Sequence, residues 1–346
     1  MPDELTTLRR LRPDVDALAP QVIDAALART RQRIDAASAD NSTPTGHRRG
    51  RRRSVAITTV ATLAAVATIA TVLGLTQVAH PESAAAVTLH DAARATSSTA
   101  ASTEAFTRVT ARERALGYVA ADGEHYDQGY LADSTTITWV PRDRSGTWIR
   151  EYWSEPARTF YGGAAARKAA ADDYATEAHH DDPERQQATG GVFGNGELGG
   201  TRAGTITIAD LPGLPRDPDA LVRRIEAAPR SVGATDDEQV FDTLAGLLSS
   251  GLVPADLRAS MYEALATLPS IVVTERQASL DGRTGTAMGL AGRSGTDRRE
   301  VIVDRSTGEY LGERTLQTRR TGSIPAGAVI DSISVETEQV RQAPSD

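Results

Sequence analysis

Two short clusters contain residue types that often bind cofactors or metal ions, and the first of them is rich in glycine. Gly194, Gly196 and Gly199 match the G-x-G-x-x-G spacing of dinucleotide-binding turns. In that motif a strand leads into the turn and a helix leaves it, so that the pyrophosphate meets the helix N-terminus. No strand pattern precedes this cluster and no helix pattern follows it. We therefore interpret residues 183–204 as a glycine-rich loop without a cofactor.

The second cluster, His179-His180-Asp181-Asp182, contains imidazole and carboxylate groups of the kinds that bind metal ions. Adjacent side chains on a helix point in different directions, whereas helical metal ligands are usually three or four residues apart. The pattern therefore favours the solvated end of a helix and predicts no metal. His125 lies in Gly-Glu-His-Tyr-Asp, which we interpret as a loop.

The sequence also lacks several catalytic signatures. It contains no cysteine, which removes disulfides, thiolate nucleophiles and cysteine-type zinc sites. The Gly-x-Ser-x-Gly, Ser-x-x-Lys and His-Glu-x-x-His patterns do not occur. No acidic pair stands in an apolar setting, although a pair that converges only in the fold stays open. We therefore predict no enzyme, no catalytic residue and no cofactor.

Charge is distributed unevenly along the 346 residues, which together carry a net charge of −8. Residues 1–54 contain 11 arginines and 7 acidic residues, giving +4, whereas the remainder contains 27 basic and 39 acidic residues, giving −12. The two parts meet at an apolar segment. Hydrophobic residues make up 40% of the chain but aromatic residues only 4%, so we expect a folded domain with an aliphatic core.

The apolar segment runs from Ser54 to Ala79 without a charged residue. As a helix it would extend about 37 Å, more than the ~30 Å hydrocarbon core of a bilayer. Five arginines directly precede it: Arg48, Arg49, Arg51, Arg52 and Arg53. Residues 77–82 contain no arginine or lysine. Because basic flanks stay in the cytoplasm, we predict a single span over 54–79 with a cytoplasmic N-terminus and an extracytoplasmic C-terminal domain in the cell membrane.

Other interpretations of this segment are weaker. A buried helix of a soluble protein would have to bury an all-round apolar surface beside five arginines. A cleaved signal peptide would find small residues at Ala84-Ala85-Ala86, but more than 50 residues precede its apolar part, which is also too long. The arginine cluster is of a kind that binds nucleic acid. Membrane topology already accounts for it, so we expect no nucleic-acid partner.

The cytoplasmic segment, residues 1–53, is too short to form a large core. Its apolar residues follow helical spacing before Arg12-Pro13 and again over residues 20–37. The apolar positions predicted to dock a partner are Leu5, Leu8, Leu11, Val22, Ile23, Leu27 and Ile34. Two such helices can bind a partner protein through these stripes. They can also pair with each other or lie on the bilayer surface.

Beyond the membrane segment, residues 80–105 predict a tether with a helix near 87–95. A folded domain is then expected over residues 106–340. Strands are predicted at 106–119, 135–141 and 147–153, followed by a helix from 164 to about 179. The second and third strands should pair across a turn. Alternation of Ile137 and Trp139, then of Trp148 and Tyr152, predicts a sheet with one buried face.

The C-terminal half has clear boundary signals. Asp217 before Pro218 predicts a capped helix start, and Thr235 with Glu238 predicts a capping box. Helices are expected over 218–227, 235–249 and 254–269, and strands over 271–276, 284–290, 299–304, 310–318 and 329–336. Strands, then helices, then strands predict an α+β ectodomain with a mostly antiparallel sheet and packed helices.

Four stretches resemble an uncharacterised family of actinobacterial single-pass membrane proteins that are often encoded beside extracytoplasmic-function sigma factors. They are residues 3–15, 214–221, 254–269, and 281–285 together with 304–311. The second reads Leu-Pro-Arg-Asp-Pro-Asp-Ala-Leu, and the last ends in Asp-Arg-Ser-Thr-Gly-Glu-Tyr-Leu. The resemblance implies a membrane-bound partner of a sigma factor and no functional residues. Zinc-type anti-sigma proteins use cysteine ligands, which this chain lacks.

The sequence therefore predicts a membrane-anchored, non-enzymatic sensor or regulatory protein. Its expected partners are the membrane, a cytoplasmic regulatory protein such as a sigma factor, and an unknown envelope ligand. One alternative is an extracytoplasmic module that binds an envelope lipid or lipoprotein. A less supported alternative is an extracytoplasmic hydrolase.

Overall fold

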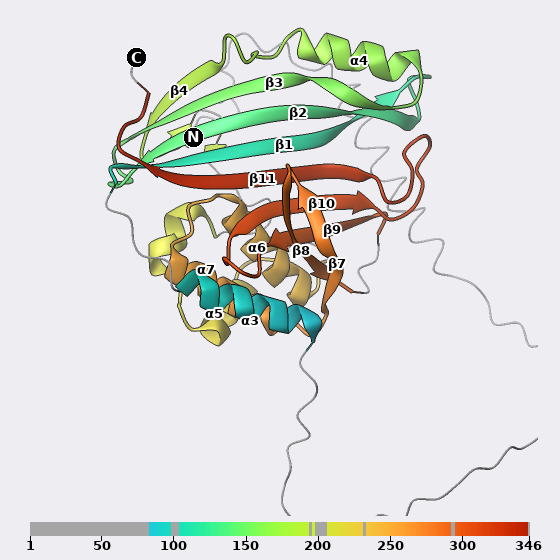
Figure 1. Ribbon diagram of the computed structural model, residues 1–346. Helices are drawn as coiled ribbons and strands as arrows, with labels where there is room; N and C mark the ends of the chain where they lie inside the picture. The colour runs from blue at the N-terminus through green and yellow to red at the C-terminus, as the bar shows by residue number, and fades with distance from the viewer. Residues whose placement is uncertain are drawn as a thin grey trace, which may run out of the picture. The chain divides into compact units, whose positions relative to one another are not determined.

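The computed structural model describes residues 83–97, 104–193, 196–197, 206–230, 233–291 and 295–344. All of them belong to the second of two units of the chain, Leu75–Asp346. Within this unit one helix precedes a set of strands, three helices follow, and strands complete the fold (Figure 1). The unit is an α+β fold with a large antiparallel sheet, which confirms the predicted α+β class.

The predicted membrane segment and the cytoplasmic segment both lie outside the described residues. This applies to the five flanking arginines and to all seven apolar docking positions. Among the residues that the structure describes, no helix is long and apolar enough to cross a membrane. The span, its orientation and the docking surface therefore stay predictions.

Nine strands form one sheet in the order β4-β3-β2-β1-β11-β10-β9-β8-β7, and each neighbouring pair is antiparallel. They are β1 Phe106–Ala120, β2 Tyr126–Pro141, β3 Thr147–Tyr161, β4 Glu184–Thr189, β7 Ile271–Leu280, β8 Arg283–Leu290, β9 Asp297–Val303, β10 Tyr310–Gln317 and β11 Val329–Val340. A small second sheet pairs β5 Val192–Phe193 with β6 Gly196–Glu197. The first and last long strands, β1 and β11, are neighbours, so the sheet joins the two ends of the fold.

The predicted hairpin of β2 and β3 is present, and both strands are longer than expected. Its register sets Trp139 opposite Ile149. Side chains that face each other across a pair share a face, and neighbours along a strand alternate. Trp139 and Trp148 therefore lie on opposite faces, and the prediction of one buried face was wrong. Trp148 joins the main core, whereas Trp139 is buried on the other side.

Residues 183–204, predicted to be a loop, include an edge strand. β4 pairs with β3 from Thr189 opposite Thr147 to Glu184 opposite Tyr152. Its sequence, Glu-Arg-Gln-Gln-Ala-Thr, has no apolar alternation because an edge strand is partly in water. The glycines Gly194 and Gly199 lie outside the described residues.

The helix predicted to reach about residue 179 is shorter. α4 spans Ala164–Tyr174. The chain then turns toward β3, where the amide of Ser154 donates to the carbonyl of Ala178 at 2.8 Å and His179 forms an isolated bridge with Ser154. Pairing with the sheet therefore replaces the last predicted helical turn.

Three helices cover one face of the C-terminal strands, as predicted: α5 Pro218–Glu226, α6 Asp236–Ser249 and α7 Ala255–Ala266. The carboxylate of Asp217 accepts from the amide of Ala220 at 2.8 Å, and Thr235 and Glu238 form the expected capping box. A short 3-10 helix, Ile208–Gly213, precedes them and was not predicted.

These helices supply most of the main core. Its fully buried members are largely aliphatic, as the composition predicted, with two aromatic additions: Leu244, Leu247, Leu257, Met261, Leu265, Phe241 and Tyr262. We call β7–β11 with α5–α7 the helix-backed half, and β1–β4 with α4 the strand wing.

The other face of the helix-backed half is covered by its own hairpin. The turn at Asp281-Gly282 brings the β7–β8 hairpin back toward β11 (Figure 1). The guanidinium of Arg283 donates to the carbonyls of Leu311 at 3.0 Å and Val335 at 2.7 Å. A small apolar cluster forms beneath the hairpin from Ala278, Leu280, Ala287, Ile302 and Leu311.

A buried ion cluster lies on the same face. Glu300 is 0% exposed and accepts from Arg314 at 2.8 Å and from Arg298 at 2.7 Å. Arg314 is 8% exposed and also donates to Glu275 at 2.6 Å. Such a carboxylate is tolerated in a core only because basic partners surround it.

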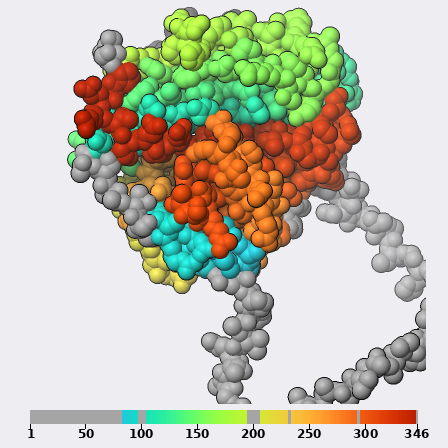
Figure 2. Space-filling model, viewed as in Figure 1, coloured from blue at the N-terminus to red at the C-terminus, as the bar shows by residue number. Residues whose placement is uncertain are grey.

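The helix predicted near residues 87–95 is present as α3, Ala84–Ser97, which packs along α7. Figure 2 shows it lying against the C-terminal half of the chain. Leu89 and Ala92 are fully buried, and the hydroxyl of Thr96 donates to the carbonyl of Gly308 at 2.8 Å. Gly308 has a φ of +70°, and a Cβ there would lie 2.1 Å from the Thr96 hydroxyl oxygen. Only glycine fits this joint.

Candidate ligand cavity

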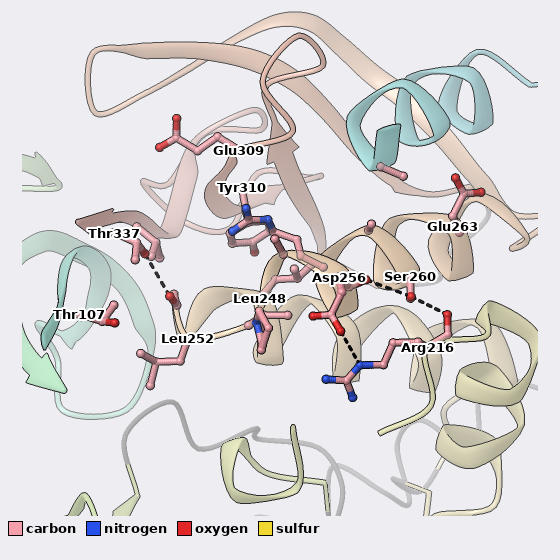
Figure 3. Close-up of a pocket in the computed structure, with 18 of the residues that line it drawn as sticks. Thr107, Arg216, Leu248, Leu252, Asp256, Ser260, Glu263, Glu309, Tyr310 and Thr337 are labelled. Carbon is pink, nitrogen blue, oxygen red and sulfur yellow. Dashed lines mark hydrogen bonds and ion pairs between the residues drawn. The ribbon is translucent and has the colours of Figure 1, made fainter. Parts of the chain in front are cut away.

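A cavity of about 1010 Å³ lies where α7, the α6–α7 loop, the end of α3 and the ends of β1 and β11 meet (Figure 3). This volume is at the upper end of the range for small-molecule sites. Part of its wall is apolar. Ala93 comes from α3, Leu248 from the last turn of α6, Val253 from the loop and Ala259 from α7, and all four are buried. The alanines leave room that larger side chains would fill.

The loop after α6 is held firmly against the sheet. The hydroxyl of Ser250 donates to the carbonyl of Leu247 at 2.6 Å and accepts from the amide of Leu252 at 3.2 Å. Gly251 adopts a φ of +66°, a conformation in which glycine commonly ends a helix. The hydroxyl of Thr337 on β11 then donates to the carbonyl of Gly251 at 3.1 Å. This wall of the cavity is therefore pre-formed.

Arg216 fixes the opposite wall. Its guanidinium donates to the carbonyl of Leu214 at 2.6 Å and to the carboxylate of Asp256 at 3.0 Å. Its own carbonyl accepts from the hydroxyl of Ser260 at 2.6 Å (Figure 3). The hydrogen bond from Arg216 lowers the pKa of Asp256 below its ordinary value. The arginine thus joins the segment before α5 to the first two turns of α7.

Every carboxylate that lines the cavity has a basic partner. The pairs are Asp256 with Arg216, Glu309 with Arg283 at 2.9 Å, and Glu263 with the imidazole of His90. Arg94 also lines the cavity, is well exposed, and contacts Asp91 on its own helix. Asp256, Glu309 and Arg94 therefore have partners of opposite charge, and Glu263 has a histidine partner.

Two further lining arginines have no carboxylate partner among the described residues. Arg144, half-buried in the β2–β3 turn, donates to the carbonyl of Leu252 at 2.7 Å. Burial lowers the pKa of its guanidinium. Arg258 on α7 is half-buried, and its Nε atom is buried without a hydrogen-bond partner. The cavity thus presents positive charge that the fold does not neutralise.

The lining hydroxyls are already engaged. Ser260 donates to the carbonyl of Arg216, and the Tyr310 hydroxyl lies 3.0 Å from that of Ser249. Burial raises the pKa of Tyr310 far above its ordinary value, so this phenol stays protonated. Neither hydroxyl is paired with a histidine in the described part of the chain. The described lining therefore offers apolar surface and cations for binding, and no nucleophile activated by a base.

A second, shallower hollow of about 390 Å³ lies beside the β9–β10 turn. Its carboxylates serve the local structure. Asp91 contacts Arg305, and Asp304 accepts from the amide and the hydroxyl of Ser306 at 2.8 and 2.7 Å. Those hydrogen bonds shape the turn, so we assign no site there.

The histidines considered from the sequence also have structural surroundings. The His179 ring stacks on Tyr174 at 4.4 Å, and the His180 ring meets the edge of Trp153 at 5.2 Å. The ring of His125 lies 2.6 Å from the carboxylate of Asp122 in an exposed turn, and this hydrogen bond raises the pKa of His125. Across the described ranges, no group of three or more histidine, aspartate and glutamate side chains is arranged to hold a metal ion.

Comparisons with known proteins do not extend this description. No protein-family model, no curated protein and no solved structure matches the chain.

No pattern in the sequence points directly to the cavity. Arg144 stands in a predicted turn and Arg258 in a predicted helix, 114 positions apart in the chain, and only the fold brings them to the same cavity. One indirect signal existed. Three of the stretches that carry the family resemblance, 214–221, 254–269 and 304–311, each contribute lining residues.

Proposed function

We propose that this protein is a single-pass membrane-anchored sensor or regulatory protein without enzymatic activity. Its extracytoplasmic domain would bind an envelope ligand in the cavity. Its N-terminal segment, residues 1–53, would hold a cytoplasmic partner such as a sigma factor.

The observation that carries this proposal is the position of α3. This helix starts at Ala84, only a few residues after the end of the predicted membrane span at Ala79, and it lines the cavity with Ala93 and Arg94. A ligand in the cavity would therefore contact the element that is covalently closest to the membrane.

The attachment of α3 to the domain is suited to such a role. Leu89 and Ala92 bury its inner face, while polar contacts hold its rim: Thr96 with Gly308, His90 with Glu263, and Asp91 with Arg305. The two side-chain pairs lie near solvent, so each contributes little, whereas the Thr96 hydrogen bond is buried. A ligand with different affinity for the docked and undocked arrangements would shift the balance between them.

The cytoplasmic half of the proposal can be tested with the full chain in membranes. Fusion of a reporter to the C-terminus should give activity outside and none inside the cell. Affinity purification should recover a sigma factor with the wild type. The recovery should fall at least 10-fold when Leu5, Leu8 and Leu11 are replaced by serine, and should persist when Thr6 and Thr7 are replaced. Equal recovery from all three chains, or a cytosolic C-terminus, would overturn the proposal.

The cavity also favours a second candidate, an envelope lipid- or lipoprotein-binding module. Its walls are apolar enough for a lipid chain, and this function needs no cytoplasmic partner. The same purification separates the two. A module of this kind would bind its ligand equally well after the serine substitutions in residues 1–53 and would recover no sigma factor.

A further inference from the structure

The cavity is lined by more arginines than carboxylates. Four arginines and three carboxylates line it. All three carboxylates are paired, and Arg94 and Arg216 are paired as well. This leaves Arg144 and Arg258 without a carboxylate partner among the described residues. The linker over residues 98–103 contains only alanine, serine and threonine, so it has no carboxylate to offer.

The position of Arg144 is fixed by its turn. The Asp143 carboxylate accepts from the amide of Ser145 at 3.0 Å and from its hydroxyl at 2.7 Å. The indole of Trp148 donates to the Arg144 carbonyl at 2.9 Å. The guanidinium itself donates to one carbonyl, that of Leu252, and a guanidinium has five N–H donors. A pre-positioned arginine therefore keeps donors for a ligand.

Arg258 stands on the second turn of α7, where Leu257 and Ala259 on either side are buried. Its Nε–H group is buried and unsatisfied. Leaving a buried donor on a charged group without a partner is costly, and the cost is recovered when an acceptor arrives. Guanidinium groups match phosphate and carboxylate oxygens particularly well, because their planar donors bind two oxygens at once.

The remaining surface of the cavity restricts the rest of the ligand. At about 1010 Å³ the cavity is far larger than a free phosphate needs. Ala93, Leu248, Val253 and Ala259 provide apolar wall, which stabilises a ligand that buries hydrocarbon. A ligand that matches both the arginines and the apolar wall has an anionic head and an apolar body.

We propose that the cavity binds an anionic amphiphile. Its phosphate or carboxylate would be held by Arg144 and Arg258, and its hydrocarbon would lie along the apolar wall. This inference rests on the ligand-binding role proposed above and names the chemical class of that ligand.

Dodecyl phosphate is a suitable probe for the full chain in phosphatidylcholine nanodiscs. Equilibrium dialysis against empty nanodiscs should show one saturable site above the partition into lipid. Arg144→Gln and Arg258→Gln should each weaken that site about 10- to 100-fold, as the loss of a charge-assisted hydrogen bond does. Arg144→Lys should retain part of the affinity, because it keeps the charge but loses the planar donors.

Arg142→Gln is the matched control, because Arg142 lies in the same β2–β3 turn as Arg144 but is exposed and does not line the cavity. This variant should bind within about 2-fold of the wild type, since its charge is screened and exposed. The melting temperature of each variant separates lost binding from lost folding. Equal affinity in wild type, Arg144→Gln and Arg258→Gln, with all three folded, would overturn the inference.

Two further probes separate the sources of the anion. Inorganic phosphate at millimolar concentration should not displace dodecyl phosphate, and dodecanol should bind much more weakly. If inorganic phosphate binds as tightly as dodecyl phosphate, the site is a free-anion site and the amphiphile is excluded. If dodecyl phosphate does not bind but a sigma factor is still recovered, the proposed function stands without this ligand class. If dodecyl phosphate binds saturably but no cytoplasmic partner is recovered, the lipid- or lipoprotein-binding module is favoured.

Discussion

The two halves of the sheet are built in different ways. In the helix-backed half, the consecutive residues Val301, Ile302 and Val303 are all fully buried, so β9 is covered on both faces. In the strand wing, the consecutive residues Arg112, Glu113 and Arg114 are all exposed, so the middle of β1 meets solvent on both faces. One continuous hydrogen-bonded sheet therefore passes from a core strand to a solvated one.

This difference shows that a strand can be ordered by hydrogen bonds to its neighbours without burying its side chains. The wing strands are long, and their faces carry cross-strand ion pairs such as Arg114 with Asp133 at 2.6 Å. Exposed pairs of this kind contribute little to stability. The free energy of folding should therefore reside mainly in the helix-backed half, and the wing should be held by its continuity with that half.

The largest expected effect is a cavity in the helix-backed half. Phe241 is 0% exposed, and Phe241→Ala should lower the free energy of unfolding by about 3–5 kcal/mol. Ile137→Ala, at a half-buried position in the wing, should cost roughly 1 kcal/mol, because less apolar surface was buried there. Urea unfolding of both variants measures the difference. Equal losses would break the comparison between the halves.

The three tryptophans, Trp139, Trp148 and Trp153, all lie on wing strands, and only Trp148 also joins the main core, so fluorescence reports mainly on the wing. Far-UV circular dichroism is dominated by helices. Coincident unfolding curves from the two signals would show that the wing depends on the other half. Loss of fluorescence at lower urea than loss of dichroism would show that the wing opens first.

The next largest effect should come from the buried ion cluster. Glu300→Ala removes the central carboxylate between Arg314 and Arg298 and leaves Arg314, which is 8% exposed, with one carboxylate fewer. Breaking such a pair should cost about 3 kcal/mol. The double variant Glu300→Leu with Arg314→Met should recover most of the melting temperature. A single variant as stable as the wild type would show that the cluster is solvated.

A smaller effect is expected at the start of α6. Thr235→Ala removes the side chain that accepts from the amide of Glu238, so it should cost about 1 kcal/mol. Thr235→Ser keeps the hydroxyl and should restore most of the loss. Thermal unfolding followed by circular dichroism tests both, and identical melting temperatures for alanine and serine would contradict the role of the cap.

The last effect concerns the wing and appears only at high pH, so it is the smallest at neutral pH. Burial and the hydrogen bond to Asp173 raise the pKa of Tyr130 to about 12. Because the unfolded chain releases this proton near pH 10, stability that is complete below pH 10 should decline as the pH rises from 10 to 12. Tyr130→Phe should remove that part of the decline. Melting temperatures from pH 9 to 12 measure it, and a constant gap between the two proteins would refute the assignment.

The sequence predicted the helix-backed half better than the wing, and the comparison explains why. Asp217, Thr235 and Glu238 mark helix starts through hydrogen bonds to nearby amides, so a local pattern suffices. β4 was missed because an edge strand needs no apolar alternation, and α4 was overextended because Ser154, distant in sequence, takes over its last turn. The opposite faces of Trp139 and Trp148 follow from a register that no local pattern encodes.

The cavity shows the same limit more strongly. Arg216 and Asp256 are 40 positions apart and Arg144 is farther still, so their meeting depends on the tertiary fold. Arginines in turns and on helices usually face solvent. An arginine that lines a cavity without a carboxylate partner can therefore be recognised only when its neighbours in the fold are known.

The joint between Ala92, Thr96 and Gly308 has a consequence for genetics. The space between α3 and the turn at Gly308 is too small for even one methyl group. Any replacement at residue 308 would act as a wedge that separates α3 from the rest of the domain, while Arg144 and Arg258 lie on other elements. Under the sensor role proposed above, selection for chains that signal without a stimulus should repeatedly recover substitutions at this codon.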